Sequence, residues 1–513
     1  TAIIVNNYSK TIDCIDVNTT SGVVRGQTLH VLNTSIDQFL GIPYAKPPVG
    51  ALRFVKPVAI TKPLKEIIDA TKPKHSCMQK PVKGLSLSED CLVLNIWAPN
   101  KTLSALKPVM FWIFGGGLSS GSIFMDSNNG SVLATHDVGQ KCCAQHGDRE
   151  DAPGNVGFYD QLLALKWVRK NIHSFGGDRD RITIFGQSAG SWSVSAHILS
   201  PLSKGLFKRA IMQSGAHMFN KDRDVFNKTE ALSLAKYIAT QENCTQSENW
   251  LQCLRRVDAQ RLVKYNSGLT RPVLGTAFLP LSAQKAFQNK QINLDIDLMA
   301  GVTRNEGAET AKLVQTQPDK TTLDQFKVGI KIGDALFHNI DVPKMTDSYL
   351  SGVNISDPLA LWHSLTDFFG DLSLKCPTYL FARQFSAGVA DKHRVYFYEL
   401  DYESAYTANI TGCDPKTMGV CHEADLPFVF GLPFIHTNDY SKQDLVFSRD
   451  VMRLWTKFAK DRRFGNEWPQ LSGAGVSSGA APLVRSLDPA NMSRIYTDPY
   501  YNTCDGVWQT YYQ

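Results

Sequence analysis

Long hydrophobic runs are absent from this sequence of 513 residues. The strongly apolar stretches, such as Val109 to Phe114, are far shorter than the ~20 residues that a membrane-spanning helix needs. Internal repeats, heptad patterns and low-complexity tracts are absent as well. These absences exclude an integral membrane helix, a coiled coil and a solenoid, so we expect a globular protein.

Charge of one sign is not concentrated anywhere along the chain. The 54 Lys and Arg residues and the 48 Asp and Glu residues are interspersed and leave a net charge of +6. A nucleic-acid-binding protein gathers its basic residues on one face or stripe. We therefore expect a solvated surface and no nucleic-acid partner, and the charge pattern says nothing about oligomeric state.

The composition is ordinary for a globular domain, with 43% apolar and 20% charged residues. A chain of this length can bury a large core without the help of disulfides. No shift in composition marks an internal boundary. We therefore expect one domain over residues 1–513.

Short apolar runs alternate with helical patterns in the first part of the chain. Pro108 to Phe114 and Arg181 to Phe185 are continuous apolar runs, which is typical of strands that are buried on both faces of a parallel sheet. Between them, Tyr159 to Ile172 repeats its apolar residues at the helical period. The alternation predicts an α/β fold with a large, mostly parallel central sheet flanked by helices.

Gly186 to Gly190 has the pattern G-x-S-x-G and lies between the second predicted strand and a predicted helix, Ser191 to Leu199. This context is typical of a nucleophile elbow, in which a serine occupies a strained turn at the N-terminus of a helix. The helix N-terminus directs N–H groups towards an anion. We therefore predict that Ser188 is a catalytic nucleophile.

Acyl transfer also needs donors for the oxyanion of the tetrahedral intermediate. Three glycines, Gly115 to Gly117, end the first predicted strand and could supply backbone N–H groups there. The same glycines could equally form an ordinary turn. Periodicity does not identify the base among the 12 histidines.

Cysteines and glycosylation sequons point to the secretory pathway. The chain has 11 cysteines, an odd number, and ten Asn-x-Ser/Thr sequons, more than chance would supply. We expect a secreted, extracellular or ER-lumenal protein whose used sequons face solvent. The candidate glycosylation sites are Asn7, Asn18, Asn33, Asn100, Asn129, Asn227, Asn243, Asn354, Asn409 and Asn491.

Four long motifs resemble the type-B carboxylesterase and cholinesterase family. They are Gly41 to Phe54, Glu89 to Pro99, Ala152 to Gly157 and Phe175 to Gly190. The resemblance extends from about Gly22 to near the C-terminus. It implies an α/β-hydrolase fold, a serine esterase that needs no metal or cofactor, and a small-molecule ester substrate.

The resemblance also implies the remaining site residues. The acid of the family's triad corresponds to Glu306, although Glu309 is a nearby competitor, and the base corresponds to His422 in Gly419 to Asp425. In this scheme His422 takes the proton of Ser188 and Glu306 orients the imidazole. The oxyanion donors would be Gly116, Gly117 and Ala189.

The family pattern further implies three disulfides and one buried ion pair. The implied ion pair is Arg53 with Glu89, as a structural contact. Five cysteines are left over, and among them a Cys413–Cys421 bond is one option. The implied disulfides are Cys77–Cys91, Cys244–Cys253 and Cys376–Cys504, and the cysteines left over are Cys14, Cys142, Cys143, Cys413 and Cys421.

One part of the family pattern is missing between Gly117 and Ala152. Where the family has an apolar inner strand, Val138 here runs directly into Gly139 and a polar stretch. We therefore predict that one inner strand is absent between Val138 and Gly139. Either the neighbouring strands close the gap or the chain folds poorly and its activity is impaired, and we favour the second.

Two further departures concern the substrate. Cholinesterases of the family have a tryptophan in the loop closed by the first disulfide, where it binds the quaternary ammonium, but the corresponding loop from Cys77 to Cys91 contains no aromatic residue here. The residue before the serine is Gln187 rather than glutamate. Pro272 to Pro280 resembles the segment near the acyl pocket but lacks its aspartate, so the acyl preference stays open.

Three hypotheses remain. The first is a carboxylesterase for uncharged or lipophilic esters. The second is a catalytically impaired or non-catalytic binding protein of the same fold. The third is an acetylcholinesterase-like hydrolase of choline esters.

Overall fold

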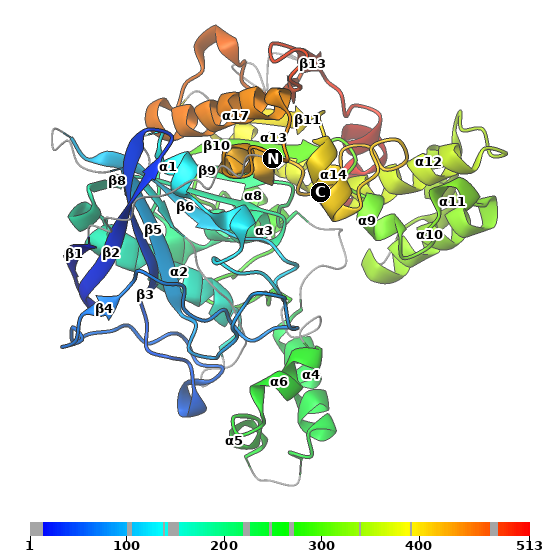
Figure 1. Ribbon diagram of the computed structural model, residues 1–513. Helices are drawn as coiled ribbons and strands as arrows, with labels where there is room; N and C mark the ends of the chain where they lie inside the picture. The colour runs from blue at the N-terminus through cyan, green and yellow to red at the C-terminus, as the bar shows by residue number, and fades with distance from the viewer. Residues whose placement is uncertain are drawn as a thin grey trace, which may run out of the picture.

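The computed structural model shows one large twisted sheet with helices on both faces (Figure 1). The described residues are 14–99, 105–136, 139–141, 153–218, 226–245, 249–265, 271–337, 340–389, 392–471 and 481–512. The candidate sites Asn7, Asn100, Cys142 and Cys143 lie outside these ranges.

The order of the strands in the sheet is β1-β2-β3-β5-β7-β6-β8-β9-β10-β11-β12-β13, and β4 pairs with β2. The run from β7 through β6 to β12 is parallel, whereas the N-terminal strands and β13 are antiparallel. The strands are β1 (Cys14–Thr19), β2 (Gly22–Val31), β3 (Thr34–Pro43), β4 (Ile68–Asp69), β5 (Val93–Pro99), β6 (Lys107–Ile113), β7 (Gly139–Lys141), β8 (Gly177–Gln187), β9 (Arg209–Gln213), β10 (Asp297–Thr303), β11 (Val395–Leu400), β12 (Leu483–Leu487) and β13 (Ile495–Thr497).

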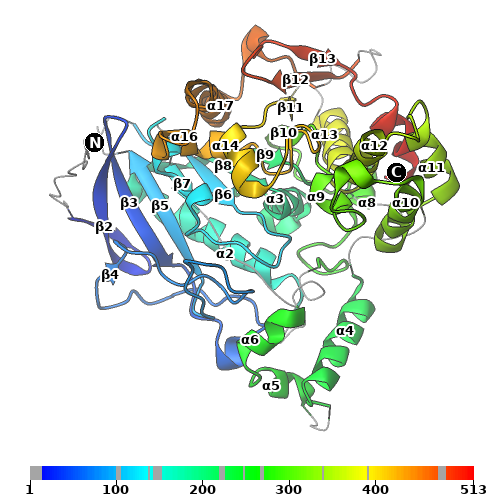
Figure 2. The ribbon, with the colours of Figure 1, turned by 45° about the vertical axis from the view of Figure 1, so that its right-hand side comes forward.

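Helices cover both faces of the sheet, with α2 and α3 on one face and α17 on the other (Figure 2). They are α1 (Ser131–Ala134), α2 (Val156–Asn171), α3 (Ala189–Leu199), α4 (Lys228–Gln241), α5 (Trp250–Leu254), α6 (Ala259–Leu262), α8 (Ala283–Gln288), α9 (Ala308–Ala311), α10 (Leu323–Phe337), α11 (Val342–Leu350), α12 (Pro358–Gly370), α13 (Cys376–Val389), α14 (Ala405–Thr411), α15 (Leu426–Phe430), α16 (Leu432–Ile435) and α17 (Lys442–Asp461). Within the described ranges, no helix has both the length and the apolar character to cross a bilayer.

The position of β6 between two helical layers explains why its sequence is continuously apolar. Val109 and Phe111 join the core under α2 and α3, while Met110 and Trp112 join the core under α17. Because successive side chains of a strand point to opposite faces, both sets are buried. The prediction of a doubly buried strand from Pro108 to Phe114 is confirmed, as is the helix predicted from Tyr159 to Ile172.

The prediction that the inner strand is absent is wrong. Strand β7 occupies that position between β5 and β6, and Gly139 and Lys141 lie opposite Val109 and Phe111 in parallel register. The pairing with β5 is antiparallel and joins Trp97 to Gln140. With 3 residues β7 is shorter than its neighbours of 7. A strand pairs through backbone N–H and C=O groups, and every residue except proline has both. A polar stretch can therefore form a strand that the pattern of apolar residues does not predict.

Four disulfides and an ion pair tie the loops together. The three disulfides that the resemblance implies are present, and Cys413–Cys421 is bonded as well, which leaves Cys14 as the free cysteine of the described residues. Arg53 forms a bidentate contact with Glu89 at 2.6 Å for both hydrogen bonds. The same guanidinium donates to the Val257 carbonyl, so this pair links the N-terminal loops to the α4–α6 segment.

Helices α4, α5 and α6 project from the body of the molecule (Figures 1 and 2). A small apolar cluster that includes Ile238 and Leu254 holds them together, with the Cys244–Cys253 bond beside it. Most of the described sequons lie at exposed positions, and Asn129 is half-buried. The exposed ones are Asn18, Asn33, Asn227, Asn243, Asn354, Asn409 and Asn491.

Candidate active site

Ser188 lies in a strained turn between β8 and α3. Its backbone has φ 56° and ψ −125°, a region that L residues rarely adopt. A Cβ on Gly190 would collide with the Ile113 carbonyl, and one on Gly186 would lie 2.5 Å from the backbone of Gly190. The two glycines are therefore required for strand and helix to approach this closely.

His422 and Glu306 come together from segments far apart in the chain. Glu306 follows β10 and is 2% exposed, and His422 lies on the loop between α14 and α15. His422 Nδ1 and Glu306 Oε2 are 2.6 Å apart. The other carboxylate oxygen of Glu306 accepts the Thr303 N–H at 2.7 Å, which fixes the orientation of the carboxylate.

The charges of this pair stabilise each other. Burial disfavours the imidazolium, but the negative charge and hydrogen bond of Glu306 outweigh it and raise the pKa of His422. Burial likewise opposes ionisation of Glu306, yet its pKa is lowered by His422 and by the neighbouring Ser214 and Thr303. The competitor Glu309 is 53% exposed and pairs with Lys312 at 2.8 Å, so Glu306 is the glutamate that reaches His422.

The side chain of Gln187, the residue before Ser188, contacts the imidazole of His422. Its Nε2 is 3.2 Å from His422 Nε2, and its Oε1 is buried with no described hydrogen-bond partner. If Nδ1 carries the proton donated to Glu306, Nε2 is free to accept from this amide. No hydrogen bond joins Ser188 to His422 among the described contacts, which is common for catalytic groups without substrate.

The glycine turn after β6 packs directly against the serine turn. A Cβ on Gly115 would lie 3.0 Å from the Ser188 Cβ, so only glycine allows this contact. Gly116 and Gly117 have φ of 112° and 60°, and no described group accepts their N–H. Ala189 is the first residue of α3, so its N–H has no partner within the helix. These three N–H groups can donate to an anion.

Asn305 joins the loops that carry Glu306 and His422, a role that the sequence did not suggest. Its N–H donates to the Val420 carbonyl and its Oδ1 accepts the Val420 N–H, both at 3.0 Å. A Cβ on Gly419 would collide with the Asn305 side chain, which explains the glycine of the G-V-x-H motif. In the sequence, the only indication of this role is that Asn305 directly precedes Glu306.

Two acids, the half-buried Glu403 and the buried Asp425, support the loop that carries His422, and neither has a described hydrogen bond to the imidazole. Glu403 accepts the Cys421 N–H at 3.2 Å, and the Cys413–Cys421 bond closes the loop beside it. Asp425 accepts from Gln213 at 2.8 Å and from Tyr398 at 3.0 Å. Burial raises the pKa of Asp425 to about 6. The acidic residue three positions after His422 thus holds the loop through side-chain hydrogen bonds.

We predict that Asn305→Ala lowers kcat by about tenfold with little change in KM. The loops that carry Glu306 and His422 lose a side-chain hydrogen bond worth about 1 kcal/mol and are held less precisely relative to each other. Steady-state kinetics with a neutral ester would measure this effect. The control is Asn289→Ala, which removes an exposed asparagine from the C-cap of α8. Equal kcat values for the two variants would show that Asn305 does not position the pair.

The parallel sheet with a strand–serine–helix turn defines an α/β-hydrolase fold. A profile of the carboxylesterase family matches residues 13–475. The chain is 32% identical to a cholinesterase of Mus musculus over 490 residues, covering 86% of this chain and 78% of the relative. It is 31% identical to acetylcholinesterase 4 of Caenorhabditis briggsae, covering 88% and 82%, and 31% identical to an acetylcholinesterase of Bungarus fasciatus, covering 93% and 82%. The chain belongs to the carboxylesterase family, a membership that supports ester hydrolysis as its class of activity.

Proposed function

We propose that this protein is a serine esterase that hydrolyses carboxylic esters through Ser188, His422 and Glu306. The observation that carries the proposal is the 2.6 Å contact between His422 and the buried Glu306, next to the strained turn of Ser188. A carboxylate that orients an imidazole beside a serine at a helix N-terminus is the arrangement that acyl transfer requires.

In the proposed mechanism, the Ser188 hydroxyl replaces the Gln187 amide at His422 Nε2. As the serine oxygen attacks the ester carbonyl carbon, its proton moves to Nε2, and the carbonyl π electrons move to the oxygen. The N–H groups of Gly116, Gly117 and Ala189 stabilise this oxyanion. Collapse of the intermediate expels the alcohol, which takes the proton from His422 and leaves an acyl-serine.

Water then completes the cycle. It gives a proton to His422 and attacks the acyl carbon, and the second tetrahedral intermediate releases the carboxylic acid as the proton returns to Ser188. Glu306 remains ionised throughout and stabilises the imidazolium that forms in both steps. No metal or cofactor takes part in this sequence.

For the substrate, we propose uncharged or lipophilic esters. A glutamate before the serine and an aromatic residue in the loop closed by Cys77–Cys91 would each favour a quaternary ammonium, and this chain has Gln187 and no aromatic residue in that loop. The names of its relatives nevertheless make choline esters a second candidate. A clear preference for acetylcholine over its neutral analogue 3,3-dimethylbutyl acetate would support that candidate.

The hypothesis of a non-catalytic binding protein has lost its main support. It depended on an absent inner strand, and β7 occupies that position. We also propose that the protein is secreted, because four disulfides are typical of oxidising compartments and most described sequons are exposed.

An organophosphate is expected to phosphorylate Ser188 stoichiometrically and to abolish hydrolysis of p-nitrophenyl acetate, because the activated hydroxyl attacks phosphorus as it attacks a carbonyl. Mass spectrometry of the peptide that contains Ser188 would locate the label. Protein unfolded in denaturant serves as the control and should remain unlabelled. A folded protein with neither label nor hydrolysis would refute the proposed function.

A further inference from the structure

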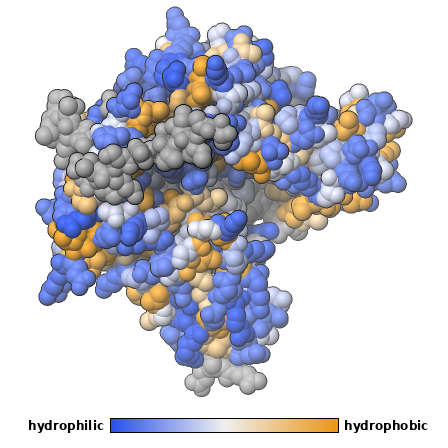
Figure 3. Space-filling model, in the orientation of Figure 1, coloured by the Kyte–Doolittle hydropathy of each residue, from blue (hydrophilic) through white to orange (hydrophobic). Residues whose placement is uncertain are grey.

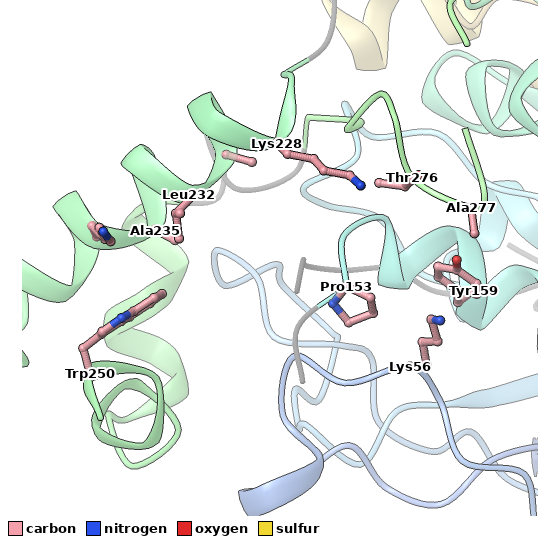
Figure 4. A pocket seen from close by; sticks show the side chains of 11 residues that line it. Lys56, Pro153, Tyr159, Lys228, Leu232, Ala235, Trp250, Thr276 and Ala277 are labelled. Atoms are coloured by element: carbon pink, nitrogen blue, oxygen red, sulfur yellow. The ribbon is translucent and has the colours of Figure 1, made fainter. Parts of the chain in front are cut away.

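A groove separates α4 from the body of the molecule, away from the residues of the proposed triad. Its volume is about 690 Å³, and Figure 4 shows side chains from α4 on one wall and from α2 and the loop near Thr276 on the other. We call it the lysine groove. It is lined by Lys56, Pro153, Tyr159, Lys228, Ala231, Leu232, Ala235, Lys236, Trp250, Thr276 and Ala277.

The charged residues among the described lining of the lysine groove are all lysines. Lys56, Lys228 and Lys236 contribute three ammonium groups, all on exposed residues, and no acidic residue is among the described lining residues. None of the three forms an ion pair with a described carboxylate, although Lys56 Nζ lies 4.8 Å from the centre of the Tyr159 ring. The groove therefore complements an anion in charge.

An apolar strip runs beside these lysines. Ala231, Leu232 and Ala235 follow Lys228 at intervals of three, four and seven residues, so all four lie along one side of α4. Leu232 is 38% exposed, and Trp250 of α5 extends the strip. Apolar surface is also visible among hydrophilic residues on the projecting segment in Figure 3. Cationic ends next to an apolar strip suit a ligand with both an anionic head and a hydrocarbon tail.

The wall opposite α4 is rigid. The Phe278 ring, next to Ala277 in the chain, is fully buried and stacks on Phe158 at 5.1 Å. The Asn155 side-chain amide donates to the Thr276 hydroxyl and to the Val273 carbonyl, both at 2.8 Å. This wall is thus held in place before any ligand binds, which lowers the entropic cost of binding.

We propose that the lysine groove binds a fatty-acid carboxylate, with the carboxylate between the lysines and the alkyl chain along α4 and Trp250. Its volume lies within the range of about 300–1,000 Å³ that is usual for small-molecule sites. None of the lining residues is Ser188, Glu306 or His422, so binding in the groove can be tested separately from hydrolysis.

Isothermal titration calorimetry with monomeric decanoate would test the site, using the intact protein after organophosphate treatment to exclude binding at Ser188. We expect saturable binding that weakens at high salt. Replacing Lys56, Lys228 and Lys236 together with glutamine should weaken it by about tenfold or more, because the carboxylate loses its cationic partners. Leu232→Ser should also weaken binding while leaving the salt dependence unchanged.

The matched control replaces three exposed lysines on α10 and α11 with glutamine, which gives the same change in net charge. These are Lys327, Lys331 and Lys344. Decanol, which has the tail without the charge, should bind at least about tenfold more weakly than decanoate. Equal binding of decanol, equal loss in the control variant, or binding to anionic phosphatidylserine vesicles without binding of monomeric decanoate would each overturn the proposal.

Discussion

Replacing Ser188 with alanine is expected to lower kcat for a neutral ester by about 10⁵-fold or more, since the variant has no group that can form the acyl-enzyme. Residual catalysis would come from direct attack of water on the ester, with the resulting oxyanion stabilised by the N–H groups of Gly116, Gly117 and Ala189. Substrate affinity should change little, because alanine removes one hydroxyl from a half-buried position. Steady-state and pre-steady-state kinetics would measure both quantities.

A measurement of thermal stability separates this loss of activity from a folding defect. The φ of 56° strains alanine as it strains serine, so the thermal unfolding midpoint of Ser188→Ala should stay close to that of the parent protein. The control is Ser233→Ala at an exposed position on α4, which should retain full activity. If Ser188→Ala kept even a tenth of the parent kcat, another nucleophile would have to be sought.

The second large effect is expected for Glu306→Gln. The amide can still hydrogen-bond to His422 but carries no charge, so the imidazolium that forms in each step loses its partner. We expect kcat to fall by about 10³–10⁴-fold, in line with the loss of the triad carboxylate in other serine hydrolases. Unfolding measurements would confirm that the buried amide is tolerated.

The pH dependence of kcat/KM tests the effect of the Glu306 charge on His422. The proposed mechanism requires neutral His422, so the acidic limb of kcat/KM is expected to report the protonation of this imidazole in the free enzyme. Glu306 raises the pKa of His422, and removing its charge should lower that pKa and shift the acidic limb to lower pH.

Glu309→Gln is the matched control, since Glu309 is a nearby glutamate that contacts Lys312 at the surface. It should leave both kcat and the pH profile unchanged. An acidic limb that stayed in place in Glu306→Gln, or moved in Glu309→Gln, would contradict the proposed role of Glu306.

The elements that the sequence predicted well share one physical property. Strand β6 is buried on both faces and is therefore continuously apolar, whereas helix α2 repeats its apolar residues at the helical period, and both patterns are visible in the order of apolar residues. The G-x-S-x-G turn was predictable for a similar reason. Its two glycines form a short motif that is recognisable in the sequence, and the contacts of Gly186 with Gly190 and of Gly190 with the Ile113 carbonyl show why they are needed.

The missed features depend on groups that carry no such pattern. Strand β7 pairs through its backbone, so its polar residues gave no sign of the inner position that it occupies. Asn305 acts across to Val420, more than a hundred residues later in the chain. The lysine groove combines residues from α2, α4 and α5 with three loops, and none of its lysines stands out in the sequence.

The sequence by itself determined the class of fold, the strained turn of Ser188 and the three disulfides of the family pattern, because each depends on local sterics or on long motifs. The family motif favoured Glu306 over Glu309, and the tertiary structure brings Glu306 to His422. Tertiary structure alone decided that Gln187 contacts the imidazole and that β7 completes the sheet. These contacts join segments far apart in the chain. Their geometry follows from how the sheet and its loops pack, and no local pattern of residues records it.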